Sequence, residues 1–255
     1  MTEMTAYIPG TPSWVDIGTP DIAAAVVFYS GLFGWTCVDQ GEEAGHYTMC
    51  ELRGKAVAAL GPQQNPGPPM WTTYISVADA DATAAAITAA GGSMVMPPMN
   101  VMDAGRMAVA MDPTGGFFSI WQPMAHIGAQ LVNEPGTLCW NELAVRDAGS
   151  ALDFYTKVFG YTVRTQTEPM LYHELQIDGR TVAGCMQMDE NWPTDLPTHW
   201  MVYVATEDTD ATAAKCAELG GTVQVPPTDI PPGRFAVLSD PQGGTFSVMT
   251  FAQPI

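Results

Sequence analysis

Two acidic side chains follow a tryptophan at the same spacing in the two halves of this sequence. Asp16 comes two residues after Trp14, and Glu142 comes two residues after Trp140. Both pairs lie on short apolar segments that are expected to be strands, where alternate side chains share one face. A carboxyl group buried beside tryptophan can have a raised pKa and act as a general acid or base. The competing interpretation is a carboxylate that is solvated or paired with arginine.

A further set of side chains could line a site for a flat, apolar molecule. Aromatic and thioether groups suit such walls, although they also fill ordinary cores, which is the interpretation we favour for the methionines. Arg106 and Arg234 could clamp a carboxylate or phenolate, or they could pair with Asp103 or with the Asp-Pro turns. The candidate ligand contacts are therefore Trp14, Trp71, Arg106, Trp121, Trp140, His199, Trp200 and Arg234.

The histidines and cysteines form no recognisable ligand pattern. The histidines, His46, His126, His173 and His199, do not recur between the halves, so each is interpreted first as a surface or core hydrogen-bonding group. The five cysteines are scattered and contain no CxxC pair. This spacing argues against a disulfide framework or a thiolate zinc site, and buried free thiols are expected instead.

The tryptophan and carboxylate pairs recur because the chain repeats itself. Gly10-Thr11-x-x-Trp14 returns as Gly136-Thr137-x-x-Trp140, and one constant offset then holds without a gap as far as Phe33-Gly34 and Phe159-Gly160. Later segments match with small loop shifts, including Gly105-Arg106 with Gly233-Arg234. Such a repeat indicates two copies of one structural unit. We assign a first module to residues 10–122, a linker to residues 123–135 and a second module to residues 136–250.

Each module is predicted to contain a strand, a helix and several strands, and then the same series again. Asp21 is a plausible helix N-cap before the alanine-rich residues 22–32, and Gly34 is expected to end that helix. Arg53-Gly54 indicates a hairpin. A second helix is expected over residues 81–90. The four units are expected to pair their strands antiparallel, and the short linker favours sheets built from neighbouring units.

Composition excludes some classes of partner. The formal net charge is −18, from 9 Lys and Arg against 27 Asp and Glu, and no basic run could neutralise phosphates. Nucleic acid and membrane surfaces are therefore not expected partners. Residues 1–10 lack the features of a signal peptide, and no apolar run is long enough to cross a membrane. A cytoplasmic protein, as a monomer or homodimer, is the default expectation.

Two motifs in each module carry a family resemblance. The sequence resembles the vicinal oxygen chelate superfamily of glyoxalase I, bleomycin-resistance proteins and extradiol dioxygenases over nearly its whole length. The linker and the following strand are similar to two-module actinobacterial glyoxalase-like proteins. The resemblance implies an α+β fold of four βαβββ units, forming two tandem modules with incomplete eight-stranded barrels whose concave faces hold ligand. The motifs are Phe28-Tyr29-x-x-x-Phe33-Gly34, Phe154-Tyr155-x-x-x-Phe159-Gly160, residues 106–116 and 234–244, and His126-Ile127-Gly128-Ala129 with Trp140-Asn141-Glu142-Leu143.

The resemblance also implies metal positions, and the residues found there depart from the family pattern. Family members normally hold a divalent metal with His, Gln or Glu on the first strand of each unit and a Glu on the last strand. The corresponding residues here are Trp14, Thr72 and Ser119, and Trp140, Met201 and Ser247. None is a good ligand for such a dication. We therefore expect no metal and no cofactor.

Several functions remain open on this basis. The first is a metal-independent protein that binds a planar, apolar or aromatic small molecule. The second is a metal-independent lyase, isomerase or cyclase of secondary metabolism that uses Asp16 or Glu142 as acid or base. A metal-dependent glyoxalase or dioxygenase requires ligands that the sequence does not supply, and nothing marks a surface for protein partners.

Overall fold

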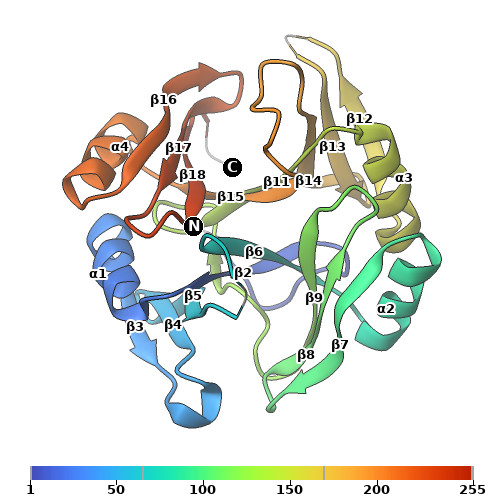
Figure 1. Ribbon diagram of the computed structural model, residues 1–255, viewed down its shortest axis with the longest axis horizontal. Coiled ribbons are helices and arrows are strands. Elements are labelled where there is room, and N and C mark those ends of the chain that lie inside the picture. Colours follow the sequence, from blue (N-terminus) through green and yellow to red (C-terminus); the bar gives the residue numbers. More distant parts are fainter. Residues whose placement is uncertain (1, 65, 169, 254–255) are drawn as a thin grey trace.

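Each half of the chain forms one curved, eight-stranded sheet with two helices, as the internal repeat predicts (Figure 1). The computed structural model describes residues 2–64, 66–168 and 170–253. The first module contains β2 (Pro12–Thr19), α1 (Ile22–Phe33), β3 (Thr36–Asp39), β4 (Thr48–Leu52), β5 (Lys55–Pro62), β6 (Met70–Ser76), α2 (Ala80–Ala89), β7 (Ser93–Val101), β8 (Gly105–Met111) and β9 (Phe117–Pro123). The second contains β11 (Leu138–Val145), α3 (Ala148–Phe159), β12 (Thr162–Gln166), β13 (Tyr172–Ile177), β14 (Arg180–Gln187), β15 (His199–Ala205), α4 (Thr209–Glu218), β16 (Thr222–Ile230), β17 (Gly233–Ser239) and β18 (Thr245–Phe251). A short sheet joins β1 (Thr2–Glu3) to β10 (Leu131–Val132), and η1 (Glu42–Ala44) is a single 3-10 turn.

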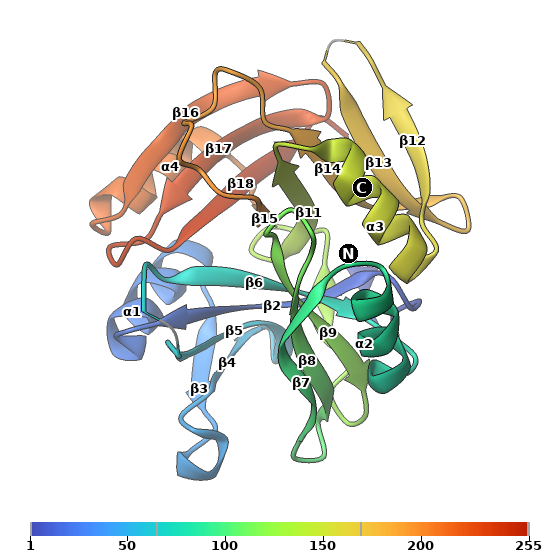
Figure 2. The same ribbon diagram turned by 45° about the vertical axis from the view of Figure 1, so that its right-hand side comes forward.

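Both sheets have the same strand order, and each is built from two neighbouring units. The order is β3-β4-β5-β2-β6-β9-β8-β7 in the first module and β12-β13-β14-β11-β15-β18-β17-β16 in the second. The two units of a module meet where β2 pairs antiparallel with β6, and where β11 pairs antiparallel with β15. The sheets curve strongly without closing, which confirms the expected incomplete barrels (Figure 2).

One expectation about strand direction is wrong. β2 pairs with β5, and β6 with β9, in parallel, and the second module repeats both parallel pairs. The helix after the first strand of a unit returns the chain in its starting direction, as in any βαβ crossover. Two antiparallel turns then bring the last strand back parallel to the first. Within the two eight-stranded sheets, the antiparallel pairs are those of the meander in each unit and of the junction between units.

An aspartate begins every helix of the repeat. The carboxylates of Asp21, Asp79, Asp147 and Asp208 each accept a backbone N–H three residues later, at 2.9–3.0 Å. This contact satisfies one of the free donors at a helix start. Gly34 ends α1 in the left-handed conformation, as predicted. None of the helices formed by the described residues has the length and apolarity to span a bilayer.

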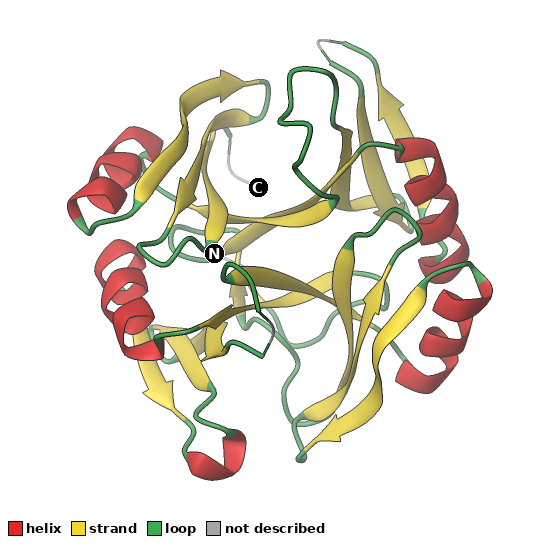
Figure 3. Ribbon diagram, viewed as in Figure 1, coloured by secondary structure: helices red, strands yellow, loops and turns green. Residues whose placement is uncertain are grey.

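The helices cover the outer faces of the sheets and meet in pairs across the two modules. α1 lies against α4 and α2 lies against α3, at opposite sides of the molecule (Figure 3). One apolar core combines Phe28 and Trp71 of the first module with Val202 and Phe246 of the second. A second core combines Phe118 with residues of α3. Neither module therefore buries its helical face by itself.

The Phe-Tyr motif of each module contacts the other module. Tyr29 donates a hydrogen bond to Asp240 at 2.9 Å, and Tyr155 donates one to Asp112 at the same distance. Both aspartates also order their own turns through backbone N–H groups. The motif that carries the family resemblance thus fixes the packing of one module on the other.

Candidate functional site

The first candidate site lies on the face of the first sheet that the helices leave uncovered, the concave side that we call the first cup. Here Asp16 accepts hydrogen bonds from the hydroxyls of Tyr74 at 2.8 Å and Tyr47 at 2.9 Å. The Tyr47 oxygen in turn accepts the indole N–H of Trp14 at 3.0 Å. Trp121 belongs to the same buried cluster. Alternation along β2 places Trp14 and Asp16 together, as the sequence predicts.

The second cup repeats this arrangement on the concave face of the second sheet. Glu142 accepts hydrogen bonds from Tyr172 at 2.7 Å and Tyr203 at 3.1 Å. Trp140 donates its indole N–H to Tyr172 at 2.9 Å. The repeated unit is therefore a tryptophan, a bridging tyrosine, a carboxylate and a second tyrosine. Its walls are apolar and come from Met201, Phe235, Met249 and Phe251.

Burial shifts the pKa values of these groups upward. Desolvation raises the pKa of Asp16 to about 6, against the lowering effect of its hydrogen bonds from Tyr74 and Tyr47. Desolvation likewise raises the pKa of Glu142. The tyrosine hydroxyls have pKa values well above their usual range, first because they are buried and then because the carboxylates are close. They therefore remain protonated donors at neutral pH.

Tyrosines and one histidine are the cup residues that sequence reasoning missed. Tyr74 and Tyr203 recur in the repeat, so comparison of the two modules could have identified them. Tyr47 immediately precedes β4 and Tyr172 begins β13, and the register of these strands cannot be read from the sequence. His126 comes from the linker, and its ring lies 4.5 Å from that of Trp14. No pattern in the sequence indicates that contact.

Trp71 and Trp200, two other candidate ligand contacts, lie on the helix-covered faces. Their indole N–H groups donate to Tyr29 and Tyr155 inside the shared cores. They alternate with cup residues along β6 and β15, so their side chains point away from the cups. The two indoles therefore lie in the shared cores and apart from the cups. His199 shares the concave face of β15 by the same alternation, at the start of the strand, with its Nδ1 2.8 Å from the oxygen of Pro197.

Arg106 and Arg234 are engaged in surface ion pairs. Arg106 binds both carboxylate oxygens of Asp81, at 2.7 and 2.8 Å, and Arg234 binds Asp210 in the same way at 2.6 and 3.0 Å. Both aspartates lie in the first turn of a helix on the outside of the molecule. These arginines anchor helices, because their guanidinium groups form ion pairs with Asp81, Asp210 and Asp229. These partners differ from the expected alternatives, Asp103 and the Asp-Pro turns.

The residues at the family's metal positions do not fit a metal. Indole, thioether and hydroxyl groups occupy these positions, and such groups are poor ligands for hard or borderline dications. The one carboxylate of each cup is already held by two tyrosine hydroxyls. Within the described parts of the chain, no three His, Cys, Asp or Glu side chains gather into a group that could hold a metal ion.

Two surface hollows lie apart from the cups. One of about 420 Å³ is lined by Pro113, Arg146, Asp147 and Thr198, at the start of α3. Another of about 440 Å³ lies between α1 and the β3–β4 hairpin. Neither contains a tryptophan or carboxylate of a cup. The candidate site is therefore defined by the side chains that meet in the cups and lies away from both hollows.

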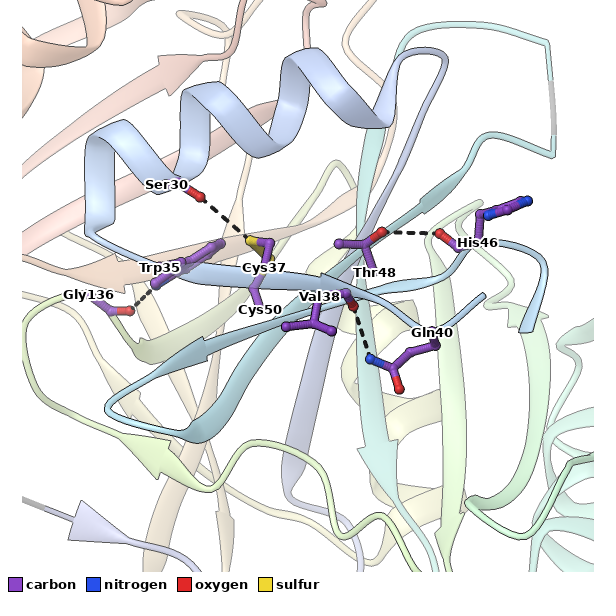
Figure 4. The surroundings of a disulfide bond; sticks show 9 residues. All are labelled: Ser30, Trp35, Cys37, Val38, Gln40, His46, Thr48, Cys50 and Gly136. Atoms are coloured by element: carbon purple, nitrogen blue, oxygen red, sulfur yellow. Dashed lines mark hydrogen bonds between the residues drawn. A yellow bond between two sulfur atoms is a disulfide. The ribbon is translucent and has the colours of Figure 1, made fainter. Parts of the chain in front are cut away.

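Cys37 and Cys50 form a disulfide, contrary to the expectation of free thiols (Figure 4). The two residues face each other across β3 and β4. Cysteine spacing does not indicate this pairing, because the register of that hairpin cannot be read from one sequence. Cys139, Cys185 and Cys216 are free and buried, as expected.

Comparison with known proteins places this arrangement in a family. The model of the Glyoxalase/Bleomycin resistance protein/Dioxygenase superfamily matches residues 11–120 and 137–248. The chain is 46% identical to the protein named "Putative glyoxylase CFP32" of Mycobacterium tuberculosis (strain CDC 1551 / Oshkosh), with 98% of each chain covered. It is 39% identical to the anthracycline biosynthesis protein DnrV of Streptomyces peucetius, over 96% of this chain and 95% of that one.

Solved structures share the fold at low sequence identity. The Mn(II)-bound glyoxalase from Novosphingobium aromaticivorans matches with a TM-score of 0.68 and 17% identity, over 97% of this chain and 84% of that chain. The 2,3-dioxygenase LapB from Pseudomonas sp. KL28 matches with a TM-score of 0.67 and 12% identity, over 96% and 93%. With two matched modules and close relatives over its whole length, the chain belongs to the glyoxalase/bleomycin resistance protein/dioxygenase superfamily.

Proposed function

We propose that the protein binds a planar, mainly apolar small molecule in a cup, without the metal site usual in the family. The observation that carries this proposal is the twice-repeated carboxylate, buried beside tryptophan and held by two tyrosine hydroxyls. A polar group kept so consistently inside an apolar wall is suited to orient a ligand. The tryptophan rings supply flat apolar surface beside it.

The hydrogen-bonding capacity of the carboxylates indicates what the ligand offers. An ionised carboxylate has about four acceptor sites, and the tyrosines use one on each oxygen of Glu142. The remaining capacity suits a hydroxyl or N–H donor on the ligand. Relatives named as anthracycline biosynthesis proteins support a ligand of this kind, because anthracyclines are planar, hydroxylated polycyclic molecules.

Quinizarin, a neutral planar dihydroxyanthraquinone, is a suitable probe for this proposal. Its visible absorption is expected to shift on binding, and the double variant Trp14→Ala/Trp140→Ala should lose binding whichever cup the ligand occupies. Val27→Ala removes an apolar side chain that is 71% exposed on α1, on the helix side of the sheet, so it should bind as the parent does. Equal binding by the double variant and the parent would show that the site is elsewhere.

A metal-independent lyase, isomerase or cyclase is the second candidate. The raised pKa of Asp16, about 6, favours it because such a group exchanges protons readily near neutral pH. Asp16→Asn and Glu142→Gln separate the candidates. If turnover of a substrate disappears while binding of that substrate survives, the carboxylate acts as acid or base. If only binding changes, the protein is a binder.

A further inference from the structure

The two cups contain the same polar arrangement but differ in what covers them. Among the described residues, those that form the cluster in the second cup all come from its own sheet, from β11, β15, β16, β17 and β18. The cluster in the first cup also includes Met4 and Tyr7 from the N-terminal segment, and Ala129 and Val132 from the linker. The first cup is therefore packed with parts of the chain that lie outside its sheet.

Residues 124–132, which we call the strap, are fastened to both sides of the first cup. On one side, His126 N–H donates to the Ala104 oxygen at 2.9 Å. On the other, Ala129 N–H donates to Ser13 and Gln130 N–H donates to Ala56, both at 2.7 Å. Tyr7 adds a hydrogen bond from its hydroxyl to the Ala129 oxygen at 2.7 Å. These contacts hold the strap across the cup.

The strap places a planar ring on the tryptophan of the first cup. The His126 ring lies 4.5 Å from Trp14 and 5.8 Å from Trp121, nearly perpendicular to both. Trp121 donates its indole N–H to the His126 backbone oxygen at 2.8 Å. Trp14 is consequently only 3% exposed. An aromatic ring at such a distance and angle is a favourable edge-to-face contact.

The tryptophan of the second cup is more exposed than that of the first. Trp140, the counterpart of Trp14, is half-buried, while Glu142 beside it is buried. Tyr172 is half-buried in the same way as its first-cup counterpart Tyr47, so the difference between the cups lies at the tryptophan. Gly184 keeps room for this group, because a Cβ there would lie 1.9 Å from the Tyr172 oxygen and 3.0 Å from the Trp140 nitrogen. Trp140 therefore keeps exposed surface at the position where the strap covers Trp14.

We propose that the strap is a built-in occupant of the first cup, and that ligand binds in the second cup alone, with a planar ring edge-on against Trp140 and a donor directed at Glu142. The His126 ring on Trp14 is the internal example of that contact. This inference rests on the proposed function and adds to it the choice of cup and the orientation of the ring.

Titration with quinizarin tests the choice of cup through single variants. The parent should bind one equivalent per chain. Trp140→Ala should weaken binding about tenfold, as loss of a central aromatic anchor does, and Trp140→Phe should retain more affinity and report on folding. Trp14→Ala should leave the affinity within about twofold. Two equivalents per chain, or a loss of affinity in Trp14→Ala alone, would overturn this proposal and leave the proposed function standing.

Fluorescence quenching by acrylamide gives a reading that needs no ligand. The emission of each tryptophan is obtained by subtracting the spectrum of its Phe variant from that of the parent. Acrylamide should quench the emission of Trp140 strongly and the emission of Trp14 weakly. Equal quenching of the two contributions would contradict the covered first cup. Absence of any quinizarin binding by the parent would instead overturn the proposed function, and this proposal would fall with it.

Discussion

A buried carboxylate with two tyrosine donors is the chemical centre of each cup. Asp16 and Glu142 could be identified from the sequence because strand alternation places them beside Trp14 and Trp140. Their tyrosine partners come from other strands, whose register is set by packing and cannot be read from one sequence. The same limit applies to the partners of Arg106 and Arg234. The helix aspartates that bind them are distant in sequence. One sequence therefore cannot distinguish an arginine that faces a cup from an arginine in a surface ion pair.

The raised pKa of Asp16 predicts a pH-dependent stability. Its pKa is about 6 in the folded protein against 3.8 as the ordinary value, so the folded state binds the proton more tightly. The contribution of Asp16 to the free energy of unfolding is therefore most favourable below pH 4 and is lost as the pH rises toward 6. The Asp16→Asn variant has no carboxyl group at this position and should not show this loss. Its free energy of unfolding minus that of the parent should therefore increase by about 2 kcal/mol between pH 4.5 and pH 8.

Urea unfolding of both proteins at several pH values measures this difference. Glu142 is present in both proteins, so its own pH dependence cancels. A relative stability that does not change with pH would mean that Asp16 has an ordinary pKa.

At the scale of elements, the strap and the β3–β4 hairpin are the features that the repeat could not predict. Residues 123–135 have no counterpart inside a module, and a segment without a repeat partner carries no signal of where it packs. The strands and helices, by contrast, follow from periodicity and caps. The helix starts at Asp21 and Asp147 and the ends at Gly34 and Gly160 illustrate this.

Gly128 holds the strap close to β2 and should be sensitive to substitution. Its φ is 105°, and a Cβ there would lie 2.3 Å from the Ser13 oxygen. Gly128→Ala should therefore loosen the strap, at a cost of about 1 to 3 kcal/mol for a residue in a strained conformation. Hydrogen exchange of residues 124–132 should accelerate selectively. A matched change at Gly115, where a Cβ meets nothing within 4 Å although φ is also positive, should leave the strap protected; faster exchange there as well would contradict the account.

The disulfide predicts a thiol count and a stability effect. Denatured, unreduced protein should present three titratable thiols per chain, from Cys139, Cys185 and Cys216. Reduction should lower stability by up to about 3 kcal/mol, because the bond between Cys37 and Cys50 closes a short loop in the unfolded chain. Five thiols before reduction would show that the bond does not form.

At the scale of the whole molecule, the two modules share their cores. The two-module α+β architecture could be predicted because the repeat spans nearly the whole chain. The pairing of α1 with α4 and of α2 with α3 could not, since both modules present similar apolar helices. Sequence similarity between the copies identifies the unit but gives no information about which surfaces of the two units meet.

Shared cores predict that neither half folds alone. Residues 1–122 would expose the surfaces that now contact Phe246 and Val202, and Tyr29 would lose its bond to Asp240. Each half expressed separately should show no cooperative unfolding, whereas the two halves expressed together should assemble. Cooperative unfolding of an isolated half, followed by circular dichroism, would contradict the shared-core description.

The position of a bound planar ring distinguishes the second cup from the first. A crystal structure of the protein with quinizarin should show one ring system against Trp140, with a hydroxyl within hydrogen-bonding distance of Glu142 and the strap still across Trp14. A ring against Trp14 with the strap displaced, or a ring in the hollow beside Arg146, would contradict the account.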